Sequence, residues 1–219
     1  VGLDNDDVFI IAGIPRLESL NLADNNNITS LWPFSNTRQL RDIHLWGSNV
    51  LDLTPLTHLD GLTFVALGVD QLGNSVEIFT HIANLDSLWL NGELGFDDFD
   101  YLMKNLSLVA MSQSYNSLFD DSYMSLITQH QTGIQTLFIE NTQVSDLSNI
   151  GVFTRLQDFG IQNTLVTDLQ PLIDLRQSQD ILYANDDWKP VLNYLNINGA
   201  PIADASQITT LQGLGVQVE

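Results

Sequence analysis

The chain has 219 residues, of which 27 are acidic and 7 are basic, so its net charge at neutral pH is −20. This excess of negative charge repels phosphate, and we therefore expect neither nucleic acid nor an anionic membrane surface as a partner. Cysteine is absent, which excludes disulfides and thiolate metal sites. No stretch reaches the ~20 consecutive apolar residues that cross a bilayer.

The first predicted elements are a capped helical turn and then a long internal repeat. Residues 5–12 predict the helical turn, which ends at Gly13. Residues 40–61, 134–155 and 156–177 then align without a gap as L-x-x-L-x-L-x-x-(polar)-x-V-x-D-L-x-(P/N)-L. Weaker copies fill the gaps between these segments, and the period of about 22 residues predicts a solenoid. The units start at Leu17, Leu40, Leu62, Leu85, Leu108, Ile134, Leu156 and Leu192.

Each unit contains a short strand and a turn, counted here from its first residue as step 0. Apolar residues at steps 0, 3 and 5 include one alternating pair, which predicts a strand whose remaining side chains point to the opposite face. Step 8 is polar in seven of the eight units, and we expect it to form hydrogen bonds where the chain turns inward. An Asp recurs at step 12 and predicts a helical cap. These residues are Asp52, Asp97, Asp120, Asp146, Asp168 and Asp204.

The outer side of the solenoid is predicted to vary along the chain. Residues 97–106 and 120–130 have helical spacing, and 75–82 is a third candidate helix, whereas the 22-residue units predict short 3₁₀ turns. Residues 178–191 fit no repeat. At the end of the chain, residues 204–212 predict a capped helix and 216–218 an edge strand, which together form a C-terminal cap over 204–219. The continuous period predicts one domain over residues 1–219.

This repeat resembles the 22-residue class of leucine-rich repeats, which is found in bacterial internalins and in a eukaryotic phosphatase regulator. The resemblance covers residues 17–177 and 192–204. It implies an α/β fold, a right-handed solenoid with a concave parallel β-sheet and convex 3₁₀ and α-helical segments. Animal extracellular members usually carry cysteine-bearing caps, so the absence of cysteine favours a bacterial origin. The high acidic charge suits a secreted or cell-surface protein, because a salty medium screens it.

The strand register also predicts which side chains lie on the concave face. These are the residues at steps 2, 4 and 6, and large aromatic residues gather among them in the middle units. Aromatic side chains on a solvent-facing sheet are typical of interaction sites, although they also pack against one another across strands. The candidate binding residues are His44, Trp46, Phe64, Trp89 and Phe138, with Tyr115 at their border.

The sequence gives little indication of catalysis. It contains no H-E-x-x-H, G-x-S-x-G, Walker or G-x-G-x-x-G motif, and its four histidines fall at unrelated repeat positions. We therefore expect no enzyme activity, no cofactor and no metal. One alternative is Ca²⁺ binding, which needs six to eight oxygen ligands. The acidic residues that could supply them are Asp97, Asp98, Asp100, Asp120 and Asp121.

Three functions remain open from the residues alone. We favour a non-catalytic scaffold, bacterial and extracellular or on the cell surface, that binds a protein on its concave face. Acidic residues around this face favour a basic partner. The alternatives are a carbohydrate-binding adhesin that uses Trp46 and Trp89 as stacking platforms, and an intracellular scaffold similar to the phosphatase regulator.

Overall fold

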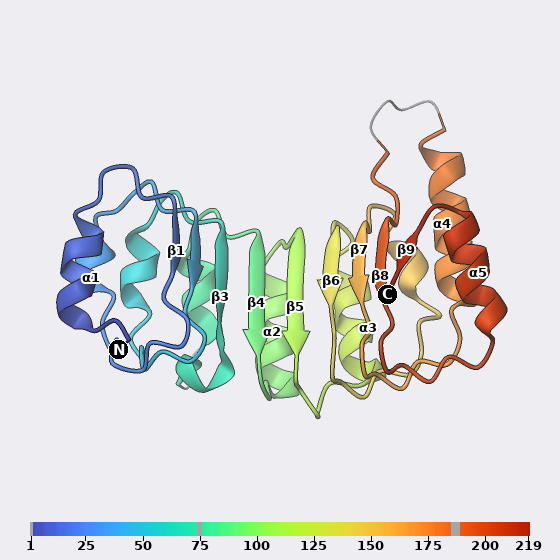
Figure 1. The fold of residues 1–219 in the computed structure, drawn as a ribbon, viewed down its shortest axis with the longest axis horizontal. Helices are drawn as coiled ribbons and strands as arrows, with labels where there is room; N and C mark the ends of the chain where they lie inside the picture. Colours follow the sequence, from blue (N-terminus) through green and yellow to red (C-terminus); the bar gives the residue numbers. More distant parts are fainter. Residues whose placement is uncertain (1, 74–75, 185–188) are drawn as a thin grey trace.

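The computed structural model describes residues 2–73, 76–184 and 189–219, which form a single curved ladder of parallel strands. The nine strands of its one sheet lie in chain order, and each pairs in parallel with the next (Figure 1). This ladder confirms the predicted leucine-rich-repeat solenoid. The strands are β1 (Ser19–Asn21), β2 (Asp42–His44), β3 (Phe64–Gly68), β4 (Ser87–Asn91), β5 (Ala110–Ser114), β6 (Thr136–Phe138), β7 (Asp158–Gly160), β8 (Tyr194–Asn196) and β9 (Gln217–Val218).

The register of the sheet is the one that the repeats predict. The step-2 residues of consecutive units are paired along the whole ladder, from Ser19 with Asp42 to Asp158 with Tyr194. Leu40, Ile43 and Leu45, at steps 0, 3 and 5, are fully buried, and the apolar residues at the same steps of the other units pack in or against one hydrophobic cluster. The exception is Gln113, at step 5 of the fifth unit, which is buried and donates to the Gly92 carbonyl oxygen at 2.9 Å. Because the spacing places these side chains inward, steps 2, 4 and 6 form the concave face.

Helices of two kinds cover the convex side (Figure 1). The predicted helices at 97–106 and 120–130 are confirmed as α2 (Phe96–Asn105) and α3 (Asp121–His130). The third candidate is a 3₁₀ helix, η4 (Val76–His81), and Ser75 lies outside the described residues. The longest helix, α4 (Gln170–Leu182), extends into the segment that fits no repeat. The other 3₁₀ helices are η1 (Trp32–Phe34), η2 (Thr54–His58), η3 (Val69–Leu72) and η5 (Ile150–Val152).

The two ends of the ladder are covered as the sequence predicts. At the N-terminal end, α1 (Asn5–Ala12) is capped by Asp4, whose side chain accepts hydrogen bonds from the backbone amides of Asp6 and Asp7. At the other end, α5 (Ala205–Gly213) begins after its cap Asp204 and precedes the edge strand β9. A helix therefore lies beside the terminal coil at each end of the ladder.

The recurrent aspartates are helix N-caps at two of the six predicted positions, Asp120 and Asp204, each of which accepts from the amide two residues ahead at 2.9 Å. Asp52, Asp146 and Asp168 accept in the same way, but the N-cap residues of the helices that follow them are Leu53, Asn149 and Leu169. These bonds to the ionised form lower the pKa of the Asp120 and Asp204 carboxyls. The prediction is wrong for Asp97 because the N-cap of α2 is Gly95, two residues earlier, and Asp97 lies in the first turn of the helix.

The residue after each strand region is held in an unusual backbone conformation. At step 7 the chain adopts a positive φ in seven of the eight units, a region that favours glycine and asparagine. Six of the seven residues suit this region, and the seventh is Tyr115, with φ at +58°. The full set is Asp24, Gly47, Gly92, Tyr115, Asn141, Asn163 and Gly199.

The polar residues at step 8 are only partly as predicted. Thr142 and Thr164 are buried, and their hydroxyls donate to the carbonyl oxygens of Ile139 and Ile161 at 2.7 and 2.8 Å. Asn25 and Asn116 also donate to carbonyl oxygens, those of Leu22 and Leu94, whereas the Ser48 hydroxyl accepts from Gln71. Asp70 and Glu93 are exposed, but Glu93 still accepts from the Ser117 hydroxyl, so the prediction fails for Asp70.

In the unit of Asp70, a neighbouring residue takes over this role. The Gln71 side chain, one position later, accepts from the Gly68 amide at 2.8 Å and donates to the Ser48 hydroxyl at 2.9 Å. The polar side chain that joins consecutive turns has therefore moved by one position within the unit.

Candidate concave binding site

The aromatic residues predicted for the concave face come together over strands β2 to β6. Trp89 lies at the centre: its ring centroid is 6.2 Å from that of Trp46, 5.2 Å from that of Phe64 and 5.8 Å from that of Phe138. The last two contacts are edge-to-face, the geometry that aromatic pairs prefer. His44 completes the cluster at 4.8 Å from Phe64 and 5.9 Å from Trp46. The aromatic side chains therefore pack against one another across the strands and are also partly exposed on the concave face.

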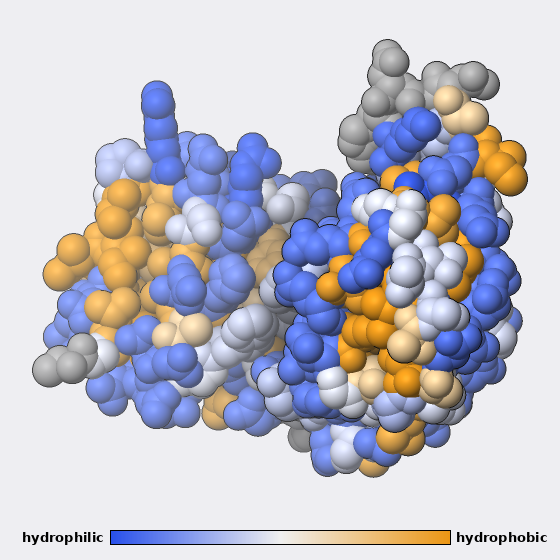
Figure 2. All heavy atoms as spheres, turned by 45° about the vertical axis from the view of Figure 1, so that its right-hand side comes forward, coloured by the Kyte–Doolittle hydropathy of each residue, from blue (hydrophilic) through white to orange (hydrophobic). Residues whose placement is uncertain are grey.

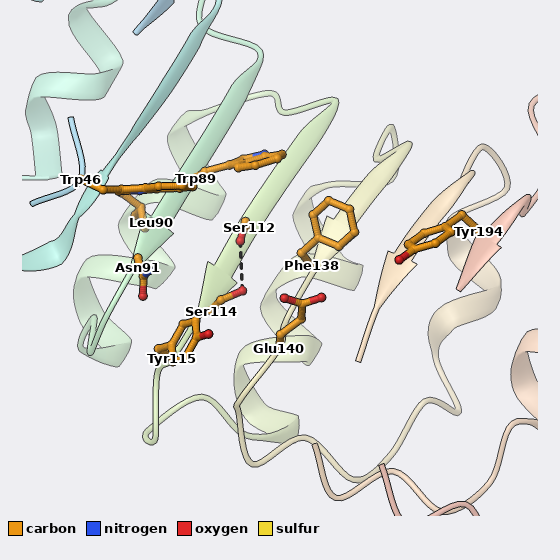
Figure 3. A pocket seen from close by; sticks show the side chains of 10 residues that line it. All are labelled: Trp46, Trp89, Leu90, Asn91, Ser112, Ser114, Tyr115, Phe138, Glu140 and Tyr194. Atoms are coloured by element: carbon orange, nitrogen blue, oxygen red, sulfur yellow. Dashed lines mark hydrogen bonds between the residues drawn. The ribbon is translucent and has the colours of Figure 1, made fainter. Parts of the chain in front are cut away.

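The two tryptophans of this cluster are nearly parallel. Their planes differ by 16°, and Figure 3 shows both indole rings edge-on, one beyond the other along the sheet. Both side chains are half-buried. Each indole N–H is buried without an acceptor anywhere in residues 2–73, 76–184 and 189–219. An unsatisfied buried donor costs ~1–3 kcal/mol, so this arrangement does not maximise the stability of the free protein.

A cavity of about 450 Å³ opens beside Trp89 on the concave face. Its volume is within the ~300–1,000 Å³ that ligand sites usually have. Aromatic side chains form its walls, and the hydrogen-bonded hydroxyls of Ser112 and Ser114, 3.1 Å apart, form part of its floor (Figure 3). The lining residues are Trp46, Trp89, Leu90, Asn91, Ser112, Ser114, Tyr115, Phe138, Glu140 and Tyr194.

Tyr115 and Glu140 lie side by side at one edge of this cavity. The Tyr115 amide donates to the Glu140 carbonyl oxygen at 2.9 Å, which joins the ends of neighbouring units. Tyr115 is 60% exposed, so its ring is available to a ligand. Its positive φ costs a non-glycine residue ~1–2 kcal/mol. Such strain at a cavity is typical of functional positions.

Glu140 has no basic partner in the described structure. The Nδ2 group of Asn196 donates to Glu140 Oε1 at 3.2 Å and to Gln162 Oε1 at 3.1 Å. The ion pairs within the described ranges join Arg38 to Asp60, Lys104 to Asp100 and Arg176 to Asp180, all away from the cavity. Burial raises the pKa of the Glu140 carboxyl above its ordinary value, and the bond from Asn196 offsets this only in part.

A glycine on the next strand creates space for two of the cavity residues. Gly160 pairs with Phe138 across β6 and β7. A Cβ atom at Gly160 would lie 2.6 Å from Phe138 Cδ1 and 2.8 Å from Glu140 Oε1, closer than real Cβ contacts. The absent side chain therefore allows the Phe138 ring and the Glu140 carboxylate to lean over β7.

The structure extends the predicted set of site residues without contradicting it. The cluster contains His44, Trp46, Phe64, Trp89 and Phe138, and the cavity adds Tyr115. Six further cavity residues were not predicted as site residues, although five of them lie in the same concave positions. These five are Ser112 at step 4, Asn91, Ser114 and Glu140 at step 6, and Tyr194 at step 2, and the sixth is Leu90 at step 5.

Three of the five acidic residues considered for Ca²⁺, Asp100, Asp120 and Asp121, have other contacts. Asp121 accepts from the Ser145 and Asp146 amides at 2.8 and 3.0 Å, and Asp100 pairs with Lys104 at 2.6 Å. Within the described ranges, no three His, Cys, Asp or Glu side chains gather in a way that could hold a metal ion. In that same part of the chain, none of the helices has the length and apolar character of a membrane span.

Solved structures with the same fold come from bacterial leucine-rich-repeat proteins. The internalin InlF of Listeria monocytogenes matches with a TM-score of 0.57 and 19% sequence identity, and the match covers 98% of this chain and 63% of the internalin. A leucine-rich-repeat protein of Leptospira interrogans matches with a TM-score of 0.51 and 15% identity, covering 100% of this chain and 59% of its own. No protein-family model and no curated protein matches the chain.

These comparisons agree with the strand ladder. The chain has the leucine-rich-repeat fold and is similar in structure to an internalin. It spans less than two thirds of each of these two proteins.

Proposed function

We propose that the chain is a non-catalytic recognition module that binds a protein partner on its concave face. The observation that carries this proposal is the aromatic cluster around Trp89 with the adjoining cavity. Tryptophan and tyrosine most often dominate the binding energy of protein interfaces. The unsatisfied indole groups and the strained Tyr115 backbone favour a binding role over cross-strand packing alone, because packing would not require either of them.

Charge supports a basic partner. Steps 2, 4 and 6 of the eight units contain Asp42, Glu140 and Asp158 but no lysine or arginine. Figure 2 shows the molecule hollowed between its two ends, with hydrophilic surface around the hollow. A basic protein surface would be attracted to this acidic face and repelled by none of its concave residues. We further propose a bacterial protein that is secreted or held at the cell surface, in line with the structural similarity to an internalin.

The experiment compares the unmodified chain with Trp89→Ala in the capture of extracellular proteins, followed by affinity measurement with each purified candidate. Loss of a central tryptophan is expected to weaken binding by about 30-fold or more. Trp32→Ala is the matched control, because Trp32 lies on the convex side and is 51% exposed. If Trp89→Ala binds every purified partner as well as Trp32→Ala does, the proposal is wrong.

Carbohydrate binding is the second candidate function, and the near-parallel indole rings of Trp46 and Trp89 favour it. Flat aromatic strips suit the apolar faces of sugar rings. A glycan array separates the two candidates. Saccharide binding that Trp46→Ala and Trp89→Ala abolish would support the adhesin, whereas silence across the array would leave protein binding as the function.

A further inference from the structure

Resting on the proposed function, we propose that the cavity receives a single arginine side chain of the protein partner. The guanidinium group would lie against the aromatic walls and pair with the Glu140 carboxylate. This proposal identifies the chemical group that the concave face recognises, which the aromatic cluster alone does not.

The aromatic walls of the cavity favour a cation. Trp89, Tyr115 and Phe138 surround it with ring faces and edges, and Trp46 and Tyr194 add two further rings (Figure 3). The negative faces of aromatic rings attract cations, most often the planar guanidinium of arginine, which also stacks on them. No lysine or arginine of this chain lines the cavity. The cation must therefore come from another molecule.

The Glu140 carboxylate lacks a cationic partner. Figure 3 shows the Glu140 carboxylate between the Phe138 ring and Tyr115, facing the cavity. It is half-buried, its Oε1 accepts one bond from the neutral Asn196 amide, and no ion pair within the described ranges includes it. A partly desolvated carboxylate without a cation is unfavourable. A guanidinium group would supply both the missing charge and two parallel donors.

The floor of the cavity supplies both space and hydrogen-bond acceptors. The cavity exists because the positions between the aromatic walls carry small side chains, Ser112 and Ser114, and because Gly160 leaves room for Phe138 and Glu140 to lean aside. The serine hydroxyls are acceptors as well as donors. They can therefore receive the guanidinium N–H groups that Glu140 does not reach. A neutral apolar side chain would leave the Glu140 carboxylate without a cation.

The test uses two tripeptides that differ only in charge, acetyl-Gly-Arg-Gly-amide and its citrulline counterpart, titrated by calorimetry. Citrulline has nearly the same shape as arginine but is neutral. We expect the arginine peptide to bind at least about 10-fold more tightly than the citrulline peptide. A third peptide with lysine is expected to bind between the two, because an ammonium group cannot pair bidentately.

Two variants show whether Glu140 is responsible. Glu140→Gln keeps an oxygen acceptor for Asn196 but removes the charge, and it is expected to reduce the preference for arginine to less than about threefold. Asp42→Asn is the matched control, since Asp42 is another concave carboxylate, on β2, that does not line the cavity. It is expected to keep the preference. Cooperative thermal unfolding, at a melting temperature no lower than that of the unmodified protein, confirms that both variants fold.

Several results would overturn the arginine site. Equal affinity for the two peptides, no binding of either at millimolar concentration, or an unchanged preference in Glu140→Gln would each do so. The proposed function fails separately. A purified protein partner whose affinity depends on Trp89 but is unaffected by Glu140→Gln would support the concave interface and exclude the arginine pocket.

Discussion

Gln131, at the end of α3, provides the sharpest test of how the coil under the cavity is held. This side chain is 2% exposed. Its Oε1 accepts from the Leu108 amide at 2.9 Å, and its Nε2 donates to the Met103 and Leu106 carbonyl oxygens at 2.7 and 2.8 Å. It thereby joins α2, the start of the next unit and α3. That unit contains β5, and hence Ser112, Ser114 and Tyr115 of the cavity.

We predict that Gln131→Met destabilises the protein by about 3 kcal/mol. Methionine has a similar shape, so packing changes little, but all three hydrogen bonds are lost at ~1 kcal/mol each. The buried amide and carbonyl groups that remain unpaired raise the upper bound to ~5 kcal/mol. Urea unfolding followed by circular dichroism measures the free energy of unfolding, and a constant slope with denaturant shows that the transition is still cooperative.

Gln129→Met is the matched control for this prediction. Gln129 lies on the same helix, is exposed, and its Nε2 bonds only to the Ser125 hydroxyl, at 3.0 Å. Its replacement is expected to change the free energy of unfolding by less than ~0.5 kcal/mol. If Gln131→Met lowers the free energy of unfolding by less than ~1 kcal/mol, or if both variants lower it equally, the three bonds of Gln131 do not hold this coil in place.

Three further predictions concern the cavity. Gly160→Ala is expected to push Phe138 and Glu140 aside and so to weaken binding of the arginine peptide at least about fivefold in calorimetry. Its free energy of unfolding should change by less than ~1 kcal/mol, because alanine suits a strand better than glycine does. Tyr115→Asn relieves the positive φ, so urea unfolding should show a stability unchanged or raised by up to ~1 kcal/mol, while peptide affinity falls. Glu140 holds its proton more tightly in the folded chain than in the unfolded chain, so its ionisation costs stability as pH rises through the folded pKa. Glu140→Gln should therefore melt at a higher temperature than the unmodified protein at pH 7, and this advantage should vanish below the ordinary glutamate value of 4.5.

The strand ladder could be predicted because the same few positions carry the same physical requirement in every unit. Steps 0, 3 and 5 fill the core and are apolar in every unit except at Gln113, so one register explains residues as distant as Leu20 and Leu195. The buried glutamine side chains that join consecutive units could not be predicted in this way. Gln131 and Gln179 perform the same role in two longer units, where Gln179 Oε1 accepts from the Leu192 amide at 2.8 Å. Both stand at step 23 of their units, a step that the units of 22 or 23 residues do not reach, so the shorter repeats offer no column in which to recognise them.

The candidate site could be predicted only in its large residues. Trp46, Trp89 and Phe138 are conspicuous in concave positions, and the register brings them together. The cavity depends on the small and polar residues between them, which are common in solvent-facing strand positions and carry no signal alone. Gly160 matters only because its neighbour across the sheet is Phe138, a relation that requires the pairing register. A pairwise reading of neighbouring concave columns would have found it.

The cavity is also the place where residues depart from the pattern of the other repeats or lack hydrogen-bonding and charged partners. Six of the seven units with a positive φ at step 7 place Gly, Asn or Asp there, and only the unit of β5 places a tyrosine. Two buried indole donors lack acceptors within the described residues, and Glu140 is desolvated without a cation. Each feature costs stability in the free protein, and none is needed to stack the units. Costs that gather at one place on an otherwise regular scaffold are typical of a functional site. A ligand that covers the tyrosine ring and neutralises the carboxylate would offset part of them on binding.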